Sequence, residues 1–271
     1  PKELPPSFDT SDLANNSTSI LSDWNTIFEL NTNINSPTFP VAKLLEESKA
    51  QYKERKKKHR DDFMSQYGSS RAAIYSISKG KLSRRFLQIP NPKHFSILSE
   101  KITSYWANYE AVFKLSDYSK SYPVVEIAAD KRSVSTNSRN VADFKNSLLK
   151  ASIDKLIEVR VDISKFYPSI YTHSVSWALL GKEKAKYYFK QKDNIEALIA
   201  RGDADAALYK YAESVDNAIR ACQERQSIGI PIGPDTSHII AEIVACRIDS
   251  ILKCKLSSID LKACRYYDDY Y

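Results

Sequence analysis

Apolar residues recur every three to four positions over most of the chain. Near the end of the sequence, six aliphatic residues keep this spacing: Ile239, Ile240, Ile243, Val244, Ile248 and Ile251. The pattern predicts a helix over about residues 235–256. Similar patterns predict helices over about residues 20–30, 93–114, 140–155 and, in several segments, 182–224. A polar helix is expected to begin near Pro40, a residue that suits a first helical turn, and to continue to about Tyr67.

Strict alternation of apolar and charged residues marks one strand. Ile157, Val159 and Val161 alternate with charged residues, which predicts a strand with one buried face and with Asp162 at its carboxyl end. Shorter apolar runs predict further strands over about residues 86–89, 124–128 and 262–267. Helices outnumber strands in this pattern, and the two kinds of element are mixed along the chain.

Composition narrows the class of protein only slightly. The chain has 271 residues, of which 42% are hydrophobic, so it can form one large domain or two small ones. No apolar run approaches the roughly 20 residues of a membrane span, so no membrane partner is expected. The first residues, PKELPPSFDT, do not resemble a secretory signal. The four cysteines lack metal-binding spacing and are expected to be reduced, mostly buried thiols of a cytoplasmic protein: Cys222, Cys246, Cys254 and Cys264.

The charge of the chain points weakly to a polyanionic partner. The formal net charge is +7 at pH 7. The densest basic run is KERKKKHR, residues 53–60, within the predicted polar helix. This run has two readings, because it is either the solvated face of a helix or a surface that contacts phosphates.

Two of the six glycines lie close together in GIPIGPDTS, residues 229–237, just before the last predicted helix. A loop of this composition lets the backbone approach a ligand closely. Alternatively, it is a plain entry into the helix, with Asp235, Thr236 or Ser237 as the N-cap.

The stretch RYYDDYY, residues 265–271, places Asp268 beside Asp269 between aromatic residues. Successive side chains of a strand point to opposite faces, so these two carboxylates converge on one ligand only if the backbone turns there. Otherwise they are two solvated charges in an ordinary hairpin.

Four motifs in chain order resemble those of the reverse transcriptases. VDISKFYPSI, residues 161–170, looks like the first palm motif, GIPIGPDTS like the following loop, and YYDD like the catalytic hairpin. In RRFLQIPNP, residues 84–92, Arg85 precedes Pro90 by five residues, as in the fingers of the family. The resemblance spans about residues 79–271. The sequence of these motifs, especially FYPSIYTHSVSWALLGK, is most similar to that of the prokaryotic abortive-infection and defence-associated enzymes.

This resemblance implies a helix-rich α/β fold, namely the right-hand polymerase fold with a palm and fingers. Residues 1–75 would be an N-terminal helical extension and the start of the fingers, and residues 76–155 the fingers. Residues 156–271 would be the palm, with a helical insertion at about 182–226. The thumb, the primer grip and the returning strand of the hairpin are not expected within this chain.

The resemblance also implies a two-metal site for Mg²⁺, which Mn²⁺ can replace. Asp162 and Asp268 would bridge ions about 3.5–4 Å apart, the carbonyl of Ile163 would add a ligand, and Asp269 would complete the anionic field. The expected picture is of three buried carboxylates that are costly without cations.

Other positions take roles in nucleotide binding from the family. Arg85 would hold the β- and γ-phosphates, with Arg84, Lys79 or Lys81 as alternatives. The remaining nucleotide-binding positions are the main chain at Lys165 and Phe166, the side chain of Tyr167, and the loop residues Ile232 and Gly233. Tyr167 would exclude a ribose 2′-hydroxyl, or else it is a core tyrosine.

Residues outside the pocket receive weaker assignments. Arg84, Ser133, Thr136 and Arg139 are candidates to line a nucleic-acid channel. His173 is expected to be structural.

The implied activity is RNA-directed or template-independent synthesis of DNA in antiphage defence, in the prokaryotic cytoplasm. Most reverse transcriptases carry Gln where this chain has Ile232, which puts faithful templated copying in doubt. The partners would be deoxynucleotides and DNA or RNA, and homo-oligomerisation is left open. The alternatives are a catalytically idle palm-fold scaffold that binds nucleic acid and an RNA-dependent RNA polymerase.

Overall fold

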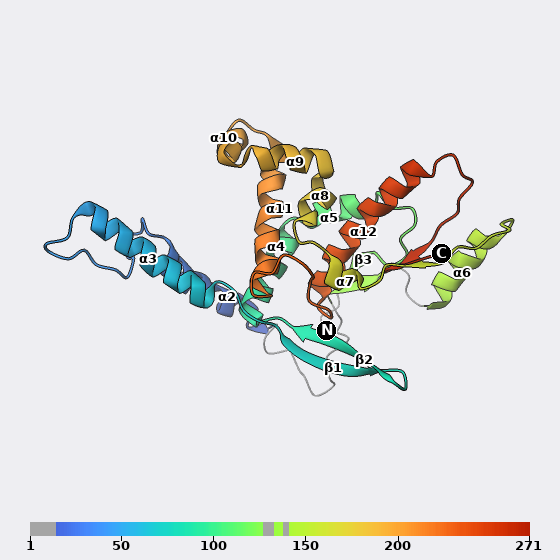
Figure 1. The fold of residues 1–271 in the computed structure, drawn as a ribbon, viewed down its shortest axis with the longest axis horizontal. Helices are drawn as coiled ribbons and strands as arrows, with labels where there is room; N and C mark the ends of the chain where they lie inside the picture. Colours follow the sequence, from blue (N-terminus) through green and yellow to red (C-terminus); the bar gives the residue numbers. More distant parts are fainter. Residues whose placement is uncertain (1–14, 127–132, 138–140) are drawn as a thin grey trace.

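A computed structural model of the chain describes residues 15–126, 133–137 and 141–271 (Figure 1). The fold is α/β, as expected: it is mainly helical, and the described residues also form three small antiparallel sheets. Within the same ranges, no helix combines the length and the apolar character needed to cross a membrane.

Two helices, α2 (Ser17–Thr32) and α3 (Lys49–Tyr67), form an arm that extends from the body (Figure 1). The prediction that the polar helix begins near Pro40 is wrong. A capping box starts α3 instead: Ser48 accepts from the Gln51 amide at 3.3 Å, and the Gln51 side chain accepts from the Ser48 amide at 3.0 Å. The reciprocal bonds satisfy two amides that lack partners within the helix, which fixes the start at this point.

The basic run on α3 is partly used to hold the arm together. Arg55 makes a two-pronged contact with Glu47, at 2.8 and 2.9 Å, and Lys56 donates to the carbonyl of Ile34 at 2.8 Å. His59 bonds Asn31 at 3.0 Å. The phosphate-contacting reading is therefore limited to the exposed lysines of the run: Lys53, Lys57 and Lys58.

A long hairpin follows, made of β1 (Ala73–Lys79) and β2 (Ser83–Ile89). The sequence predicted only the second half of β2, where Leu87 is fully buried. Both strands are otherwise largely exposed, so their sequences carry little apolar alternation to mark them.

The helix expected over residues 93–114 is interrupted. It forms α4 (Pro92–Ser104) and α5 (Trp106–Phe113), which are separated at Tyr105. The Tyr105 ring stacks on Tyr211 with centroids 3.7 Å apart, a long-range contact that helical periodicity does not encode.

A second small sheet lies between α5 and the next helix. It pairs β3 (Pro123–Val125) with β4 (Val134–Thr136), and α6 (Val141–Ser152) follows. Part of the strand expected over residues 124–128 lies outside the described residues.

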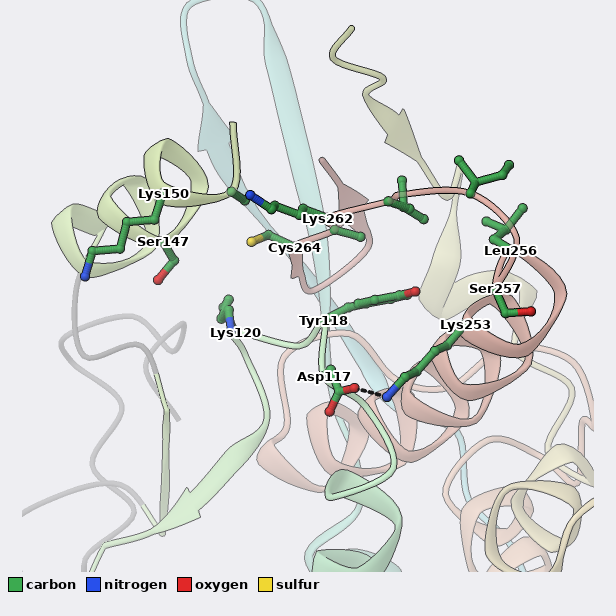
Figure 2. A pocket seen from close by; sticks show the side chains of 14 residues that line it. Asp117, Tyr118, Lys120, Ser147, Lys150, Lys253, Leu256, Ser257, Lys262 and Cys264 are labelled. Atoms are coloured by element: carbon green, nitrogen blue, oxygen red, sulfur yellow. Dashed lines mark hydrogen bonds and ion pairs between the residues drawn. The ribbon is translucent and has the colours of Figure 1, made fainter. Parts of the chain in front are cut away.

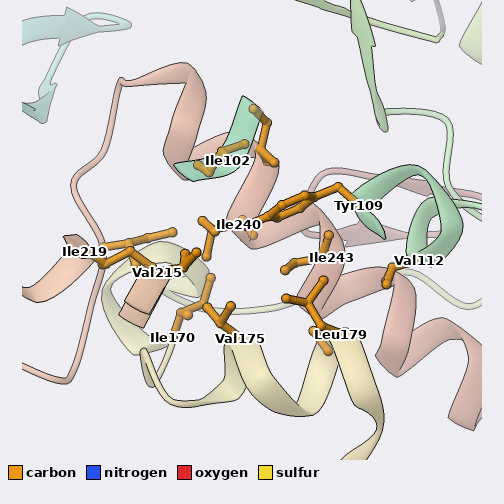
Figure 3. Close-up of a cluster of buried hydrophobic side chains, with 14 of the residues drawn as sticks. Ile102, Tyr109, Val112, Ile170, Val175, Leu179, Val215, Ile219, Ile240 and Ile243 are labelled. Carbon is orange, nitrogen blue, oxygen red and sulfur yellow. The ribbon is translucent and has the colours of Figure 1, made fainter. Parts of the chain in front are cut away.

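The main core gathers side chains from α4, α5, α8 (Ser174–Leu180), α11 (Ala204–Ala221) and α12 (Asp235–Lys255) (Figure 3). The helices expected over residues 182–224 and 235–256 are confirmed. The former also include α9 (Lys182–Lys190), the short 3₁₀ helix η1 (Lys192–Asn194) and α10 (Ile195–Ala200). The N-cap position of α12 is Pro234, without a side-chain cap bond, so the capping roles considered for Asp235, Thr236 and Ser237 are wrong.

The third sheet contains β5 (Val161–Asp162), β6 (Arg265–Tyr266) and β7 (Asp269–Tyr270). The prediction of a strand over 157–162 with one buried face is wrong. Ile157 and Val159 are 82% and 65% exposed and lie outside β5. Alternation shows which side chains share a face, but it does not show whether another layer covers that face.

The cysteines agree with the prediction of reduced, mostly buried thiols. All four are free, and Cys254 is exposed while the other three are buried.

Candidate active site

The three motif aspartates meet in the sheet β5–β7–β6. Asp162 on β5 lies opposite Asp269 on β7, and the amide of Ile163 donates to the carbonyl of Asp268 at 3.1 Å. Directly opposed residues of an antiparallel pair share a face of the sheet, so Asp162 and Asp269 lie on the same face. The backbone turns at Tyr267 and Asp268, as convergence requires. The return strand, which the sequence was not expected to include, begins with β7.

The charges in this sheet influence one another. Partial burial raises the pKa of Asp268, and the negative charges of Asp269 and Asp162 raise it further. The positive charge of Arg85 on β2 acts in the opposite direction and lowers it. Arg85 is therefore close enough to Asp268 to act on its carboxylate, although it lies about 180 residues earlier in the chain.

The aspartates are less buried than expected. Asp162 is exposed, and Asp268 and Asp269 are partly buried, which corrects the picture of three buried carboxylates. Throughout residues 15–126, 133–137 and 141–271, no three His, Cys, Asp or Glu side chains are grouped so that they could hold a metal ion. Adjacent side chains on β7 and its turn point in different directions, which explains why the three aspartates do not form a closed set.

The donor chemistry nevertheless fits Mg²⁺. This ion takes hard oxygen ligands and commonly binds through one or two carboxylates, with phosphates and waters completing the shell. Asp162 and Asp268 supply such carboxylates. Partial burial is the main cause of the raised pKa of Asp268, and the charges of Asp269 and Asp162 add to it, so a cation would stabilise the ionised form. The carbonyl of Ile163 is a hard donor of the same class.

The two arginines of β2 have different environments. Arg84 reaches across the hairpin to Ser76, with bonds of 2.8 Å to the side chain and 3.0 Å to the carbonyl. Arg85 is the neighbouring residue, so its side chain leaves the other face of the strand. The structure thus brings Arg85, rather than Arg84, towards Asp268. Lys79 and Lys81 lie at the tip of the hairpin. Lys79 is the last residue of β1, and Lys81 lies in the turn that follows.

The glycine-containing loop packs against α7 (Phe166–Ser169). Gly229, with φ of 87°, donates to the carbonyl of Ile170 at 2.8 Å, and Ile230 donates to the carbonyl of Tyr167 at 3.1 Å. A Cβ at Gly229 would lie 3.2 Å from the carbonyl oxygen of Pro168. A close approach between two chain segments explains this glycine, in addition to its backbone conformation.

The same loop is held from its other side by Gln88, which the sequence did not single out. The Gln88 amide donates to the carbonyl of Ile232 at 2.9 Å, and the Gln88 side chain accepts from the Ile232 amide at 3.3 Å. The main chain of Ile232 is therefore clamped by β2, and Gly233 follows with φ of 121°. The one feature of the sequence that could have identified Gln88 is its place within RRFLQIPNP, one of the four motifs.

The residues after Ile163 form a sharp turn into α7. Lys165 adopts the left-handed region, with φ of 52°, and Phe166 is buried in the main core. Tyr167 packs against that core but keeps part of its surface exposed, so it has features of both predicted roles.

Ser133 and Thr136 lie outside the sheet β5–β7–β6 that carries the aspartates. Ser133 is exposed and Thr136 lies on β4, opposite Pro123. Arg139 lies outside the described residues. His173 bonds Asp216 at 2.7 Å, in agreement with a structural role.

Tyr267 holds a strained conformation in the turn that carries Asp268. Its φ is 56°, in the left-handed region that glycine favours. Such a conformation costs on the order of 1–3 kcal/mol and persists only where its surroundings impose it. Three groups do so: the Ser121 hydroxyl accepts from the Tyr267 amide at 2.8 Å, Arg265 donates to its carbonyl at 2.8 Å, and the His238 ring lies 5.0 Å from the tyrosine ring.

Arg265 is the centre of a buried ionic cluster beneath this turn. Its side chain is 0% exposed and donates to Glu242 at 2.6 and 3.1 Å and to Asp249 at 2.9 and 3.1 Å, both on α12. Ser119 donates to Glu242 at 2.5 Å, and the Tyr270 hydroxyl donates to Asp249 at 2.7 Å. Burial alone raises the pKa of Glu242, but the charge and hydrogen bonds of Arg265 outweigh it and hold the pKa below its usual value.

The contacts of this cluster also show which side chains lie on each face of the sheet. Arg265 and Tyr270 are paired across β6 and β7, and both side chains reach towards α12. Tyr266 and Asp269 therefore occupy the opposite face, where Tyr266 packs on Phe144 of α6 with centroids 4.9 Å apart. Asp162 and Asp269 thus face away from α12, the helix that anchors their hairpin.

No model of a known protein family matches the chain, and no curated protein matches it. The resemblance to reverse transcriptases accordingly rests on the motifs of the sequence.

Replacing Arg265 with methionine should lower the free energy of unfolding by about 3–5 kcal/mol, because it leaves two buried carboxylates without their cation. Urea denaturation followed by circular dichroism measures the loss. Arg247→Met is the matched control, since Arg247 is a half-buried arginine on α12 that donates to the main-chain carbonyl of Ala178. Equal losses in the two variants would contradict the central role of Arg265.

Proposed function

We propose that this chain contains the palm and fingers of a polymerase of the reverse-transcriptase type, which adds deoxynucleotides to a 3′-hydroxyl in prokaryotic antiphage defence. The observation that carries the proposal is the register of β5 and β7. It places Asp162 opposite Asp269, with Asp268 in the intervening turn and bonded through its carbonyl to Ile163. Three motif residues from two distant parts of the chain are thereby brought to one small sheet.

The aspartates would hold Mg²⁺ in this polymerase. Asp162 and Asp268 would be the main ligands, with the Ile163 carbonyl beside them and Asp269 adding negative charge. When bound, a pair of such ions activates the attacking hydroxyl and neutralises charge on the leaving pyrophosphate. The mutual repulsion of the carboxylates supports this role, because it is a cost that binding of cations would offset.

Arg85 would bind the triphosphate of the incoming nucleotide. Its charge reaches Asp268, whereas Arg84 is occupied by Ser76 on the neighbouring strand. A guanidinium offers paired donors to phosphate oxygens, which suits the β- and γ-phosphates. The amides of Lys165 and Phe166, at the turn after β5, would contribute further donors to the same group.

Tyr167 and Ile232 would shape the sugar and base side of the pocket. Their main chains are connected through the loop, since Ile230 bonds Tyr167 and Ile232 is clamped by Gln88. The clamp uses only main-chain atoms of Ile232, so its side chain can be changed without removing the contacts that position the loop.

Asp268→Asn should reduce Mg²⁺-dependent incorporation of labelled deoxynucleotides by several orders of magnitude. In metal-free protein the variant should be at least as stable as the wild type near neutral pH. The wild-type carboxyl has a raised pKa, so its contribution to stability is lost as the pH rises through that pKa.

Asp260→Asn is the matched control for this test, because Asp260 is an exposed carboxylate paired with Lys155. Near-normal incorporation by Asp268→Asn would exclude the two-metal assignment. Absence of incorporation by the wild-type protein itself would favour an idle scaffold that binds nucleic acid.

Tyr167→Val should narrow the preference for deoxynucleotides over ribonucleotides, because a smaller side chain leaves room for a 2′-hydroxyl. Single-nucleotide incorporation assays with each kind of substrate give the ratio. Tyr171→Val serves as the control, since Tyr171 is exposed and its ring meets the His173 ring edge to face. A ratio that stays constant would make Tyr167 a core residue, and a wild-type preference for ribonucleotides would favour an RNA polymerase.

Ile232→Gln should make the products depend more strongly on an added template. Isoleucine has no donor or acceptor, so the wild-type pocket lacks one polar contact that could penalise a wrong nucleotide. Defined homopolymer templates are supplied one at a time, and the DNA made is sequenced. Wild-type products strictly complementary to each template would refute this reading of Ile232.

A further inference from the structure

A basic groove lies beside the β6–β7 hairpin. It has a volume of about 570 Å³ and lies between α6, the end of α12, the segment before β6 and residues 117–120 (Figure 2). None of the aspartates of the candidate active site lines it. Its wall includes Cys264, which exchanges two main-chain hydrogen bonds of 2.9 Å with Tyr271. The groove therefore adjoins the same sheet that carries the candidate active site.

The charge of this groove is strongly asymmetric. Lys120, Lys150, Lys253 and Lys262 come from four different segments, and Asp117 is the one acidic residue among those that line it, which leaves a net charge of +3. Lysines that line one groove repel one another, and an anion bound between them would offset this repulsion.

The lysines are held in different ways. Lys253 forms an ion pair with Asp117 at the rim (Figure 2). Lys262 pairs with Asp154 at 2.9 Å, and Lys150 is turned outward on α6 (Figure 2). Lys120 has no acidic partner among the described residues, and its positive charge acts on Cys264, where burial raises the thiol pKa and Lys120 lowers it. Lys120 is thus the cation best placed for a ligand in the groove. Lys253 is the second, because its partner Asp117 also lines the groove, whereas Asp154, the partner of Lys262, does not.

We propose that this groove binds the phosphate backbone of a single-stranded nucleic acid at a site separate from the candidate active site. Lysine ammonium groups act as point charges that accept phosphates in many orientations, which suits a strand better than a single oriented small ligand. Tyr118 lies in the same wall and offers an aromatic face on which a base can stack. The inference goes beyond the proposed function, because binding here requires neither nucleotide addition nor a metal ion.

The test measures binding of a fluorescently labelled single-stranded oligonucleotide of mixed sequence by anisotropy, with EDTA present and nucleotides omitted. Lys120→Ala/Lys253→Ala should weaken binding several-fold. It should also flatten the dependence of log Kd on log salt by about 1.4, at about 0.7 for each lost contact with a single strand. Asp117→Asn should have the opposite effect and tighten binding, because it removes the acidic residue and releases Lys253.

The control is Lys192→Ala/Lys210→Ala, which removes the same charge from two exposed lysines paired with Glu213 and Glu196. Equal affinity and salt dependence in the two double variants would overturn the proposal. The proposal would also be overturned if Lys120→Ala/Lys253→Ala lost binding to phosphatidylserine vesicles while its oligonucleotide binding stayed unchanged. That result would assign the groove to a lipid surface. Because no nucleotide is added, failure of this test and failure of the polymerase proposal are distinguishable.

Discussion

The contact of Arg265 with Glu242 and Asp249 is the interaction on which the candidate site depends. The two carboxylates belong to α12, the longest helix of the main core, whereas the arginine belongs to the hairpin that carries the aspartates. A buried ionic group is expensive to desolvate, and the expense is offset only when its donors and acceptors are well matched. Here the guanidinium donates to both carboxylates and to the carbonyl of Tyr267, and Ser119 and Tyr270 supply further donors to the acids. The position of the hairpin is thus set by the helical core.

The strands of the site could not fix the position of the aspartates by themselves. Each strand of the site has two residues, far fewer than an independently stable sheet needs. The strained turn at Tyr267 adds a cost that the sheet cannot offset, so the groups around it must impose the conformation. The same logic applies to the loop at Ile232, where Gln88 supplies both contacts from a strand about 140 residues earlier. Short functional segments are positioned in this chain by a few polar contacts from larger elements.

This division explains what the sequence could and could not predict. The resemblance to reverse transcriptases implied that Asp162, Asp268 and Asp269 would converge, whereas the periodicity of apolar residues predicted α12 because that signal is local. The partners of Arg265 were missed, since a Glu and an Asp on an amphipathic helix look like solvated charges until tertiary contacts bury them. The burial of Ile157 and Val159 was wrongly expected for the complementary reason: alternation is a property of the strand, whereas burial requires a neighbouring layer. Gln88 was overlooked because its role depends on a loop far away in the chain.

The distribution of charge around the β6–β7 hairpin links the two proposals. Three carboxylates gather at the candidate active site, and they would repel the phosphates of any nucleic acid that approached them. Arg85 offsets part of this repulsion at short range, as its effect on the pKa of Asp268 shows. The lysines of the groove lie beside the same sheet and contribute positive charge from outside the site. Attraction from a basic surface raises the local concentration of a polyanion without placing a cation among the aspartates, where it would compete with metal ions. If both proposals hold, the carboxylates would stay close together for chemistry, while the attraction of a polyanionic partner would come from residues that take no part in that chemistry.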